Sequence, residues 1–322
     1  MLPDAGGQRK VVDSSGELVY VSGGGRRSLS STVRAMSADG LATAARSYLY
    51  VPGDRPERFE KAGRSGADAV ILDLEDAVAP AAKDEARAAV VAWLRAAPPP
   101  PQQWWVRINA GERGDDDVAA LEGCRVQGVF VPKATPERLA ALASSGLALC
   151  ALVETAEAVV RAVELARSEA VVALAMGEVD LVAELGIEQR GTDDPLWPIR
   201  SQVVVACAAV GLQPPIGPVS VDFSDMEALR RSTQALRGAG FFSRQAIHPA
   251  QVPVINEVMT PSEDDMARAA RVLELFERAA GGVCVDDDGR MVDEAVIRSA
   301  RRTVARGRLR QSPLGPATTP AS

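Results

Sequence analysis

The sequence predicts an α/β fold, a (β/α)8 TIM barrel with a C-terminal helical appendix, on the strength of two observations. Between residues 46 and 250, eight short β-branched or apolar runs alternate with longer stretches in which apolar residues recur at three and four. This span also fits the roughly 200 to 250 residues that such a barrel needs. The main alternative, an open doubly wound sheet, usually has a G-x-G-x-x-G first turn, whereas the first turn here is VPGDRPERF.

The eight predicted strands follow one another at regular intervals. In order they are SYLYVPG (47–53), DAVILDLED (68–76), WWVRIN (104–109), VQGVFVPK (126–133), LALCALVET (147–155), VVALAMGEVD (171–180), GPVSVDF (217–223) and SRQAIHP (243–249). Predicted helices such as PERLAALASSG and AEAVVRAVELARS lie between them.

Both ends of the chain differ in character from the barrel. Residues 1–45 are rich in serine and glycine without sustained periodicity, which predicts a flexible extension, and their acidic residues argue against a transit peptide. After the barrel, Thr260-Pro261-Ser262-Glu263 predicts a capping box that opens a helix to about Ala280. An Asp-Gly turn in VCVDDDGRMVD and a last helix from Glu294 to Gly307 follow. We therefore expect a helical lid segment over 251–307 and a disordered tail over 308–322.

The composition narrows the class of protein. With 322 residues, 47% hydrophobic and 25% charged, the chain is typical of a globular protein. The net charge of -7 argues against a nucleic-acid-binding surface, so we expect a small ligand. The sequence has no long apolar run and no apolar segment near its start, which indicates neither a membrane span nor a secretory signal and favours a cytoplasmic location.

Histidine and cysteine are scarce. The single histidine, His248, makes zinc sites built on several histidines unavailable, so catalysis must depend on carboxylates, Arg, Lys or an oxygen-ligated metal. The four cysteines have no paired spacing and lie in or next to apolar stretches, as small buried hydrophobic residues do.

Charged and polar residues gather where the predicted strands end, and a barrel brings its C-terminal strand ends together. They are Asp73, Glu75, Asp76, Arg107, Asn109, Lys133, Glu154, Asp180 and Asp222. Glu154 and Asp180 end consecutive strands, so their carboxylates are expected side by side, which suits Mg²⁺; the alternative for each is a helix N-cap. Arg107 follows two tryptophans and needs an anion, either an internal carboxylate or a substrate oxyanion.

The same segments resemble a known family. RSYLYVPGDRPERFEKA, AVILDLEDAVAP, WVRIN, VFVPK, LVET, MGEVDL, VSVDFSD, AIHPAQVPVIN and GRMVDEAV are similar, in order, to the motifs of citrate lyase beta-like proteins. These belong to the magnesium-dependent aldolase/citrate lyase superfamily, which includes malyl-CoA and citramalyl-CoA lyases. The resemblance runs from about Arg46 to Arg306.

The resemblance implies a magnesium-dependent barrel that forms a homotrimer or larger homo-oligomer. Glu154 and Asp180 would hold the metal, and Arg107 and Glu154 would bind the substrate. Asp293 aligns with a carboxylate that a neighbouring subunit supplies as acid/base, although its sequence position alone favours the N-cap of the last helix.

Five residues fall where relatives contact coenzyme A: Tyr50, Arg55, Lys61, Ile247 and His248. The two cations suit phosphate groups, and Tyr50 offers a stacking face. Without the resemblance, Arg55 and Lys61 would be interpreted as solvated charges at a helix start, and His248 as an ordinary strand-end histidine.

Two details place the chain within the superfamily. The sugar-acid aldolase branch has a Glu-His pair with a histidine base where this chain has Glu75-Asp76, which favours CoA-ester chemistry and makes Asp76 a catalytic candidate. Many relatives read Gly-x-Glu-Asp before the metal aspartate, whereas this chain has Val179 before Asp180, so support of the metal by a neighbouring glutamate is in question.

The expected function is a Mg²⁺-dependent carbon–carbon lyase of a β-hydroxyacyl-CoA thioester of the malyl, citramalyl or citryl type, or the reverse condensation. Alternatives are a citrate lyase beta subunit that works with an acyl-carrier subunit, and a malyl-CoA thioesterase. A further alternative, from a different class of protein, is a non-catalytic CoA-ester-binding protein. The departure from the family pattern at Val179 is the reason for considering it.

Overall fold

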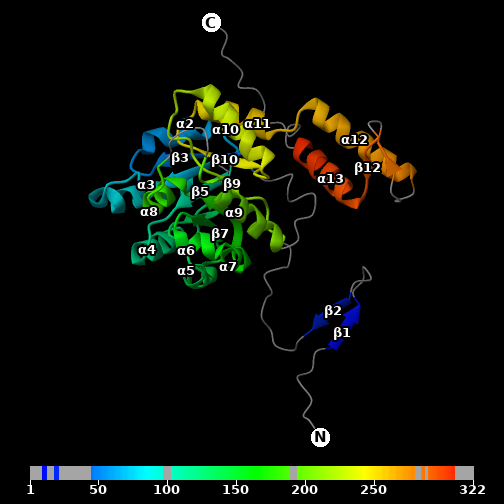
Figure 1. Cartoon of the computed structure of the whole chain (residues 1–322). Coiled ribbons are helices and arrows are strands. Elements are labelled where there is room, and N and C mark those ends of the chain that lie inside the picture. The colour runs from blue at the N-terminus through cyan, green and yellow to red at the C-terminus, as the bar shows by residue number, and fades with distance from the viewer. Residues whose placement is uncertain are drawn as a thin grey trace. The chain divides into compact units, whose positions relative to one another are not determined.

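The computed structural model describes residues 45–96, 103–188, 194–279, 284–286 and 289–308, and the backbone alone of 9–12, 18–21, Cys284 and Arg308. The chain divides into two compact units, residues 1–35 and 36–322. In the first, β1 (Arg9–Val12) and β2 (Leu18–Val21), blue in Figure 1, pair as an antiparallel sheet. This sheet was not predicted from the sequence, because its two strands are short valine-containing runs that lie among serines and glycines. The predicted tail from residue 309 on lies outside the described residues.

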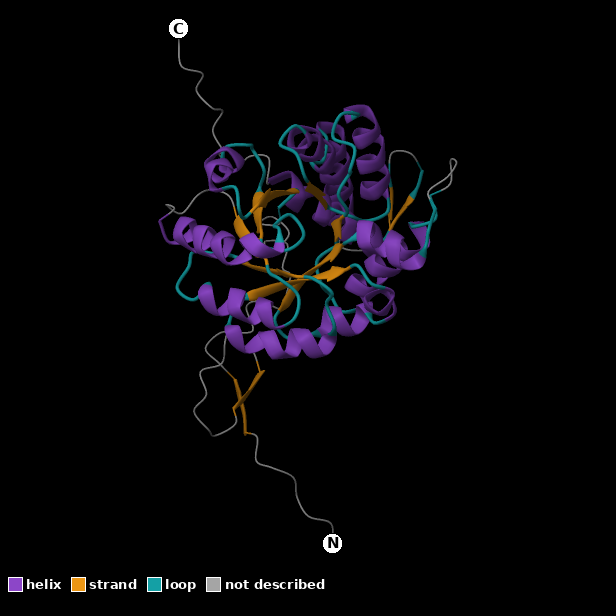
Figure 2. Ribbon diagram, turned by 90° about the vertical axis from the view of Figure 1, so that its left-hand side faces the viewer, coloured by secondary structure: helices purple, strands orange, loops and turns teal. Residues whose placement is uncertain are grey.

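The second unit contains a closed barrel of eight parallel strands, which confirms the predicted fold (Figure 2). Around the barrel the order is β10-β3-β4-β5-β6-β7-β8-β9. The strands are β3 (Ser47–Pro52), β4 (Ala69–Asp73), β5 (Gln103–Arg107), β6 (Gly128–Val131), β7 (Ala148–Val153), β8 (Val171–Met176), β9 (Ile216–Gly217) and β10 (Ser243–Ala246). Each of the eight predicted runs therefore contributes a strand.

The seventh strand is much shorter than its sequence run suggested. It ends at Gly217, because Pro218 follows and proline has no N–H to donate to a neighbouring strand. As a result Asp222 does not end a strand. Its Oδ1 instead accepts hydrogen bonds from the N–H groups of Ser224 and Asp225, in an exposed turn before the next helix.

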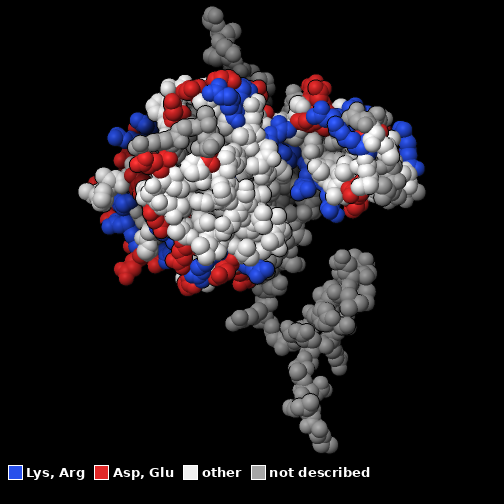
Figure 3. Space-filling view, in the orientation of Figure 1, with Lys and Arg blue, Asp and Glu red and all other residues white. Residues whose placement is uncertain are grey.

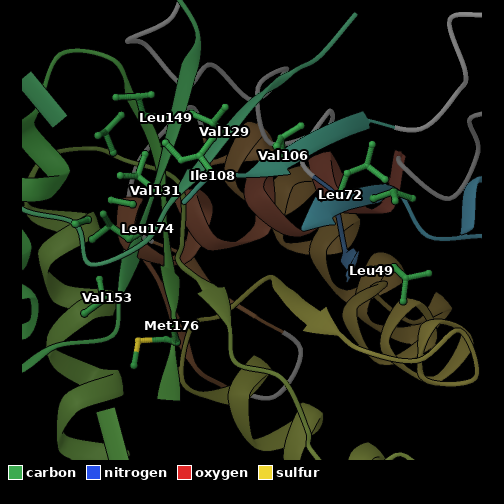
Figure 4. Packing of buried hydrophobic residues seen from close by; sticks show 14 of the residues in the cluster. Leu49, Leu72, Val106, Ile108, Val129, Val131, Leu149, Val153, Leu174 and Met176 are labelled. Atoms are coloured by element: carbon green, nitrogen blue, oxygen red, sulfur yellow. The ribbon is translucent and has the colours of Figure 1, made fainter. Parts of the chain in front are cut away.

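Helices cover the outside of the barrel (Figures 1 and 2). They are α2 (Phe59–Gly63), α3 (Lys83–Ala96), α4 (Glu112–Ala120), α5 (Pro136–Leu142), α6 (Ala156–Val160), α7 (Ala162–Arg167), α8 (Glu178–Leu185), α9 (Trp197–Ala209), α10 (Met226–Gly238) and α11 (Gln251–Met259), with 3₁₀ turns η2 (Pro56–Arg58), η3 (Pro80–Ala82) and η4 (Ala143–Ser145). Alternate strand residues such as Leu49, Leu72 and Val106 face these helices and form the main core (Figure 4).

The remaining strand residues fill the inside of the barrel. Bulky Tyr48, Trp105 and Phe130 pack edge to face there, and small Cys150 and Ala173 lie on the other strands. Side chains alternate along a strand, so the next inward-facing position on each strand lies two residues further along, nearer the C-terminal end of the barrel. Those positions carry the candidate site.

The C-terminal segment consists of α12 (Glu263–Arg278), β11 (Cys284–Val285), β12 (Met291–Val292) and α13 (Glu294–Arg308), and β11 and β12 pair antiparallel on either side of the predicted turn. The barrel layer extends beyond residue 250, because α11 packs against α10, β3 and β10. The guanidinium of Arg306 lies 3.9 Å from the ring centroid of Phe242 and donates to the Met259 carbonyl at 2.6 Å, joining α13 to the barrel.

The capping box of α12 is two residues later than predicted. Ser262 is the N-cap, and it exchanges hydrogen bonds with Asp265 rather than Thr260 with Glu263. The Thr260 hydroxyl instead donates to the Asn256 carbonyl at the end of α11. Among the described residues, no helix combines the length and apolar character needed to cross a membrane.

Candidate active site

Strands β4 and β5 bring three carboxylates around one guanidinium, a group that we name the arginine cluster: Asp73, Glu75, Asp76 and Arg107. Arg107 Nε and Nη2 donate to the two carboxylate oxygens of Asp73 at 2.7 and 2.5 Å. Its Nη1 lies 2.8 Å from Glu75 Oε2 and 3.3 Å from Asp76 Oδ2. Of the two partners considered for Arg107, the structure therefore shows an internal carboxylate. The bidentate pair fixes the guanidinium plane.

Glu75 is the unusual carboxyl in this cluster. Burial raises its pKa to about 8, the charge of Arg107 opposes this rise, and the charges of Glu154 and Asp76 add to it. Although Oε2 lies close to Arg107, it makes no well-aligned hydrogen bond. The pKa of Glu75 therefore lies near neutral pH, in a site that also holds a guanidinium.

Tyr50 lies under the arginine cluster, inside the barrel. Its hydroxyl donates to Gln245 Oε1 at 2.8 Å, and the Arg107 guanidinium stands 5.1 Å from its ring centroid. Burial raises the pKa of Tyr50 well above its usual value, so the phenol stays neutral. Gln245 in turn donates to the carbonyls of Met176 and Gly217, which fixes the floor of the site.

Strands β6, β7 and β8 contribute a second group, the lysine cluster: Lys133, Glu154 and Asp180. Lys133 Nζ lies 2.5 Å from Asp180 Oδ2 and 3.3 Å from Glu154 Oε1. Burial raises the pKa of Glu154, and Lys133 opposes this rise. For Lys133, burial lowers the pKa, but the contacts with Asp180 and Glu154 raise it overall, so a charged ammonium stands between two carboxylates.

The helix N-cap explanation fails for both carboxylates of the lysine cluster. Thr155, not Glu154, caps α6, because its side chain accepts from the Ala158 N–H. Asp180 lies within the first turn of α8, whose N-cap position is Gly177. Neither carboxylate caps a helix, and both instead contact the Lys133 ammonium.

Gly177 is required for the approach of β8 to Glu154. A Cβ atom at this position would stand 2.4 Å from Glu154 Cβ and 2.8 Å from its Oε2. Glu178, the next residue, does not support the lysine cluster, because both its oxygens accept from Arg200 at 2.5 and 2.6 Å. This pair anchors the start of α8, the helix that carries Asp180.

The donor set suits a hard divalent cation. Two carboxylate oxygens converge on one position that a positive charge already occupies, and oxygen ligands with room for water are what Mg²⁺ prefers. No group of three or more His, Cys, Asp or Glu side chains that could hold a metal occurs in the described part of the chain.

The residues predicted to contact coenzyme A lie on two separate segments. Arg55 and Lys61 are exposed around η2 and α2. His248 stacks on Phe223, with ring centroids 5.2 Å apart, and Ile247 is 40% exposed beside it. The Tyr50 ring, by contrast, packs against Phe130 and Arg107 inside the barrel.

Asp293 occupies the N-terminus of α13. Its Oδ1 accepts hydrogen bonds from the N–H groups of Ala295 and Val296, as the N-cap interpretation predicted. These contacts are made by Oδ1 alone. A capping role therefore does not prevent Oδ2 from acting elsewhere.

Two residues that support the site, Lys83 and Gln245, were not identified from the sequence. Lys83 Nζ donates to the carbonyls of Leu74 and Glu75, both at 2.8 Å, and so holds the loop that follows β4. Asn109, expected near the site, is instead bound to buried Asp117 through its own N–H and side-chain amide. The polar glutamine within SRQAIHP was a visible signal for Gln245, whereas nothing local marks Lys83.

A cavity of about 690 Å³ lies elsewhere, near Arg46, which directly precedes β3. Its arginines are already paired with carboxylates: Arg46 with Asp68, Arg230 with Glu257 and Arg237 with Asp265. The N-terminal end of a barrel generally serves stability, so we place the candidate site at the other end.

The chain is similar to known proteins over most of its length. The family described as HpcH/HpaI aldolase/citrate lyase matches residues 46–249. A citrate lyase subunit beta-like protein from Mycobacterium tuberculosis is 37% identical over 274 residues, covering 83% of this chain and 97% of the relative. A (3S)-malyl-CoA thioesterase from Cereibacter sphaeroides is 35% identical over 269 residues, covering 81% and 94%. An L-malyl-CoA/beta-methylmalyl-CoA lyase from the same species is 30% identical over 293 residues, covering 79% and 92%.

The solved structures extend the likeness to three dimensions. The CitE protein of M. tuberculosis, crystallised with magnesium, acetoacetate and coenzyme A, superimposes with a TM-score of 0.71 at 36% identity. It covers 82% of this chain and 99% of its own. The magnesium and coenzyme A expected from the sequence thus accompany a structural relative.

Proposed function

The chain belongs to the HpcH/HpaI aldolase/citrate lyase family, and from this premise we propose that it is a magnesium-dependent carbon–carbon lyase. Its substrate is a β-hydroxyacyl-CoA thioester of the malyl, citramalyl or citryl type, cleaved to acetyl-CoA and a keto acid or formed in reverse. One observation carries the proposal: an oriented guanidinium and a carboxylate pair that binds a cation stand at the same end of the barrel.

Glu154 and Asp180 would hold the magnesium, which when bound supplies Lewis-acid polarisation of the keto-acid carbonyl. The chemistry of the pair favours this assignment, because both side chains are oxygen donors and converge on a cation. Gly177 allows β8 to approach Glu154, and Arg200 anchors α8 through Glu178.

Arg107 would stabilise the oxygen that becomes negative as the carbon–carbon bond breaks. Asp73 holds Nε and Nη2, so the plane of the guanidinium is set before substrate arrives. Nη1 has the weaker partners, since Glu75 Oε2, 2.8 Å away, makes no well-aligned hydrogen bond and its contact with the 64% exposed Asp76 is 3.3 Å long. A substrate oxygen can replace that contact without disturbing the bond to Asp73.

A carboxylate must take the methyl proton of the acetyl group in condensation and return it in cleavage. We assign this proton to Asp293 of a neighbouring subunit, whose Oδ1 binds its own helix while Oδ2 is left for the reaction. Asp76 stands beside Arg107 Nη1 and is the second candidate. Loss of the true acid/base is expected to lower kcat by roughly 10²- to 10⁴-fold.

The same proposal requires a homo-oligomer, a trimer or larger. The sequence has no charged residue from Ser201 to Val221, and Figure 3 shows a broad uncharged face over α6 and α9. Val160 on α6 is 79% exposed and Val205 on α9 is 65% exposed. An apolar face of this kind supports a subunit contact.

For the CoA moiety, we assign Arg55 and Lys61 to phosphate groups, because both are exposed cations near the start of the barrel's first helix. Ile247 and His248 would contact the same ligand from the loop after β10. Tyr50, given its buried hydroxyl, would act through Arg107 instead.

A thioesterase is the second candidate, favoured by one observation: the relative named as a malyl-CoA thioesterase is 35% identical, against 30% for the one named as a lyase. The decisive experiment incubates the protein with malyl-, citramalyl- and citryl-CoA and Mg²⁺ and identifies products by mass. Acetyl-CoA with a keto acid supports the lyase. Free CoA with the intact hydroxy acid supports the thioesterase.

Variants connect the outcome to the site. Glu154→Gln and Asp180→Asn are expected to lose activity by about 10²- to 10³-fold, whereas Arg64→Met, a 79% exposed residue paired with Glu60, serves as the control. CoA-ester binding without any product would instead support a non-catalytic binding protein. Activity that appears only with an acyl-carrier subunit would support a citrate lyase beta role.

A further inference from the structure

Lys133 occupies the position that the metal needs. Its Nζ lies 2.5 Å from Asp180 Oδ2 and 3.3 Å from Glu154 Oε1, so its single charge contacts both carboxylates and partly offsets their repulsion. A Mg²⁺ ion bound to the same oxygens stands about 2.0–2.1 Å from each. An ammonium group and the ion cannot share this space, and their like charges repel.

The backbone of Lys133 is held by a hydrogen bond, and its side chain is partly exposed. Its N–H donates to Glu154 Oε1 at 2.7 Å, and its φ of 46° lies in the left-handed region that residues with side chains rarely adopt. This strained backbone aims both the N–H and the side chain at Glu154. The side chain is 42% exposed on a flexible four-carbon stem, so Nζ can leave while the N–H bond remains.

From these contacts we infer that Lys133 is a positioning residue, a built-in cation that keeps Glu154 and Asp180 together before magnesium binds and is displaced when it does. Without it, two carboxylates would face each other with no counter-charge, and Asp180, whose side chain is 38% exposed, would turn toward water. The lysine thus keeps the site assembled but competes with the ion. Magnesium affinity is therefore lower than the two carboxylates alone would give.

Arg107 shows why only one of the two clusters can exchange its cation. Its guanidinium is held by two parallel bonds to Asp73 and is 13% exposed. Removing it would break a bidentate pair, whereas Lys133 gives up single contacts on a half-exposed stem.

The inference rests on the proposed metal ligands, and one titration separates the two. Mg²⁺ binding to the full-length protein is measured by calorimetry for wild type, Lys133→Met, Lys133→Arg and Glu154→Gln, with Arg64→Met as a control for loss of one cation. Lys133→Met is expected to bind Mg²⁺ about fivefold more tightly, the size expected for losing a half-exposed ion pair. Lys133→Arg keeps a cation and is expected to bind no more tightly than wild type.

Melting temperatures supply the second readout. In EDTA, Lys133→Met is expected to melt below wild type, because the carboxylates lose their counter-charge, and saturating Mg²⁺ is expected to raise its Tm by more than it raises that of wild type. Lys133→Gln repeats both measurements with a neutral side chain that can still donate a hydrogen bond, in case the Met variant does not fold.

Each outcome has a defined consequence. Unchanged or weaker Mg²⁺ binding in the Met and Gln variants, with normal binding in wild type, would overturn the role of Lys133 and leave the proposed ligands intact. Wild-type binding equal to that of Glu154→Gln would overturn both the ligand assignment and the inference.

Discussion

The arginine cluster and the lysine cluster stand at the same end of the barrel, and each combines carboxylates with one cation. In the arginine cluster, Asp73 binds Arg107 through two parallel bonds, and both side chains are almost buried, at 2% and 13% exposure. In the lysine cluster, Asp180 and Lys133 are 38% and 42% exposed and share one short contact. The first cluster is a fixed structure, and the second is an exchangeable one.

This difference shows how one barrel end can hold both a permanent and a temporary charge. A buried guanidinium with its geometry satisfied is suited to stabilise charge that develops during a reaction. A half-exposed ammonium is suited to give way to a metal. The two clusters should therefore lose stability to very different extents when a carboxylate is neutralised.

Asp73→Asn should give the largest effect on stability. It removes the bidentate partner of buried Arg107 and weakens the acceptor for the Glu75 N–H, so we expect the free energy of unfolding to fall by about 3–5 kcal/mol. Urea denaturation measures this loss. Asp76→Asn, which changes a 64% exposed carboxylate of the same cluster, is the matched control and should change the free energy of unfolding by about 1 kcal/mol or less. Equal losses in the two variants would contradict a fixed Asp73–Arg107 pair.

Gly177→Ala tests the close approach of β8 to the lysine cluster. The new Cβ would meet Glu154 Cβ at 2.4 Å, so we expect about 1–3 kcal/mol of destabilisation, together with weaker Mg²⁺ binding as Glu154 is pushed aside. Gly238→Ala is the control, because nothing lies within 4 Å of its added Cβ. Full Mg²⁺ affinity in Gly177→Ala would show that Glu154 is not a ligand.

Glu75→Gln makes a prediction about pH. Burial raises the pKa of Glu75 to about 8, so between roughly pH 4.5 and 8 the folded protein keeps a proton that the unfolded chain has released. Wild-type stability from this group therefore falls as pH rises through that window. The variant lacks the titration, so its free energy of unfolding relative to wild type should rise by about 1–2 kcal/mol from pH 6.5 to pH 8. Urea denaturation at both pH values measures it, and a constant difference would refute the raised pKa.

Asp180→Asn should have the smallest effect on stability. Its ion pair with Lys133 is half exposed, so in EDTA we expect a change of about 1 kcal/mol or less in the free energy of unfolding. The rise of Tm on adding Mg²⁺ should disappear in the same variant. A loss in EDTA as large as that of Asp73→Asn would show that the two clusters are equally rigid.

Much of the fold followed from the sequence, because the eight runs carry the period-two alternation that buries one face outside and one face inside the barrel. The polar residues at the ends of these runs also gave a prediction of which side chains reach the C-terminal end of the barrel. It failed at Asp222, where Pro218 ends the strand early, and at Asn109, which binds Asp117 instead. The α12 cap was misplaced because Thr260 and Ser262 are both good N-cap residues, and only tertiary contacts choose between them.

The sequence by itself determined the barrel, the family motifs and the set of charged residues that share one end, since these depend on periodicity and residue type. Only the tertiary structure decided how those charges pair. Arg107 is held by Asp73, and Lys133, with a left-handed backbone that no local pattern predicts, stands between Glu154 and Asp180. Pairing depends on distances between residues that are far apart in the chain, and burial sets how strongly the paired charges interact. Both are defined only once the strands have closed into a barrel.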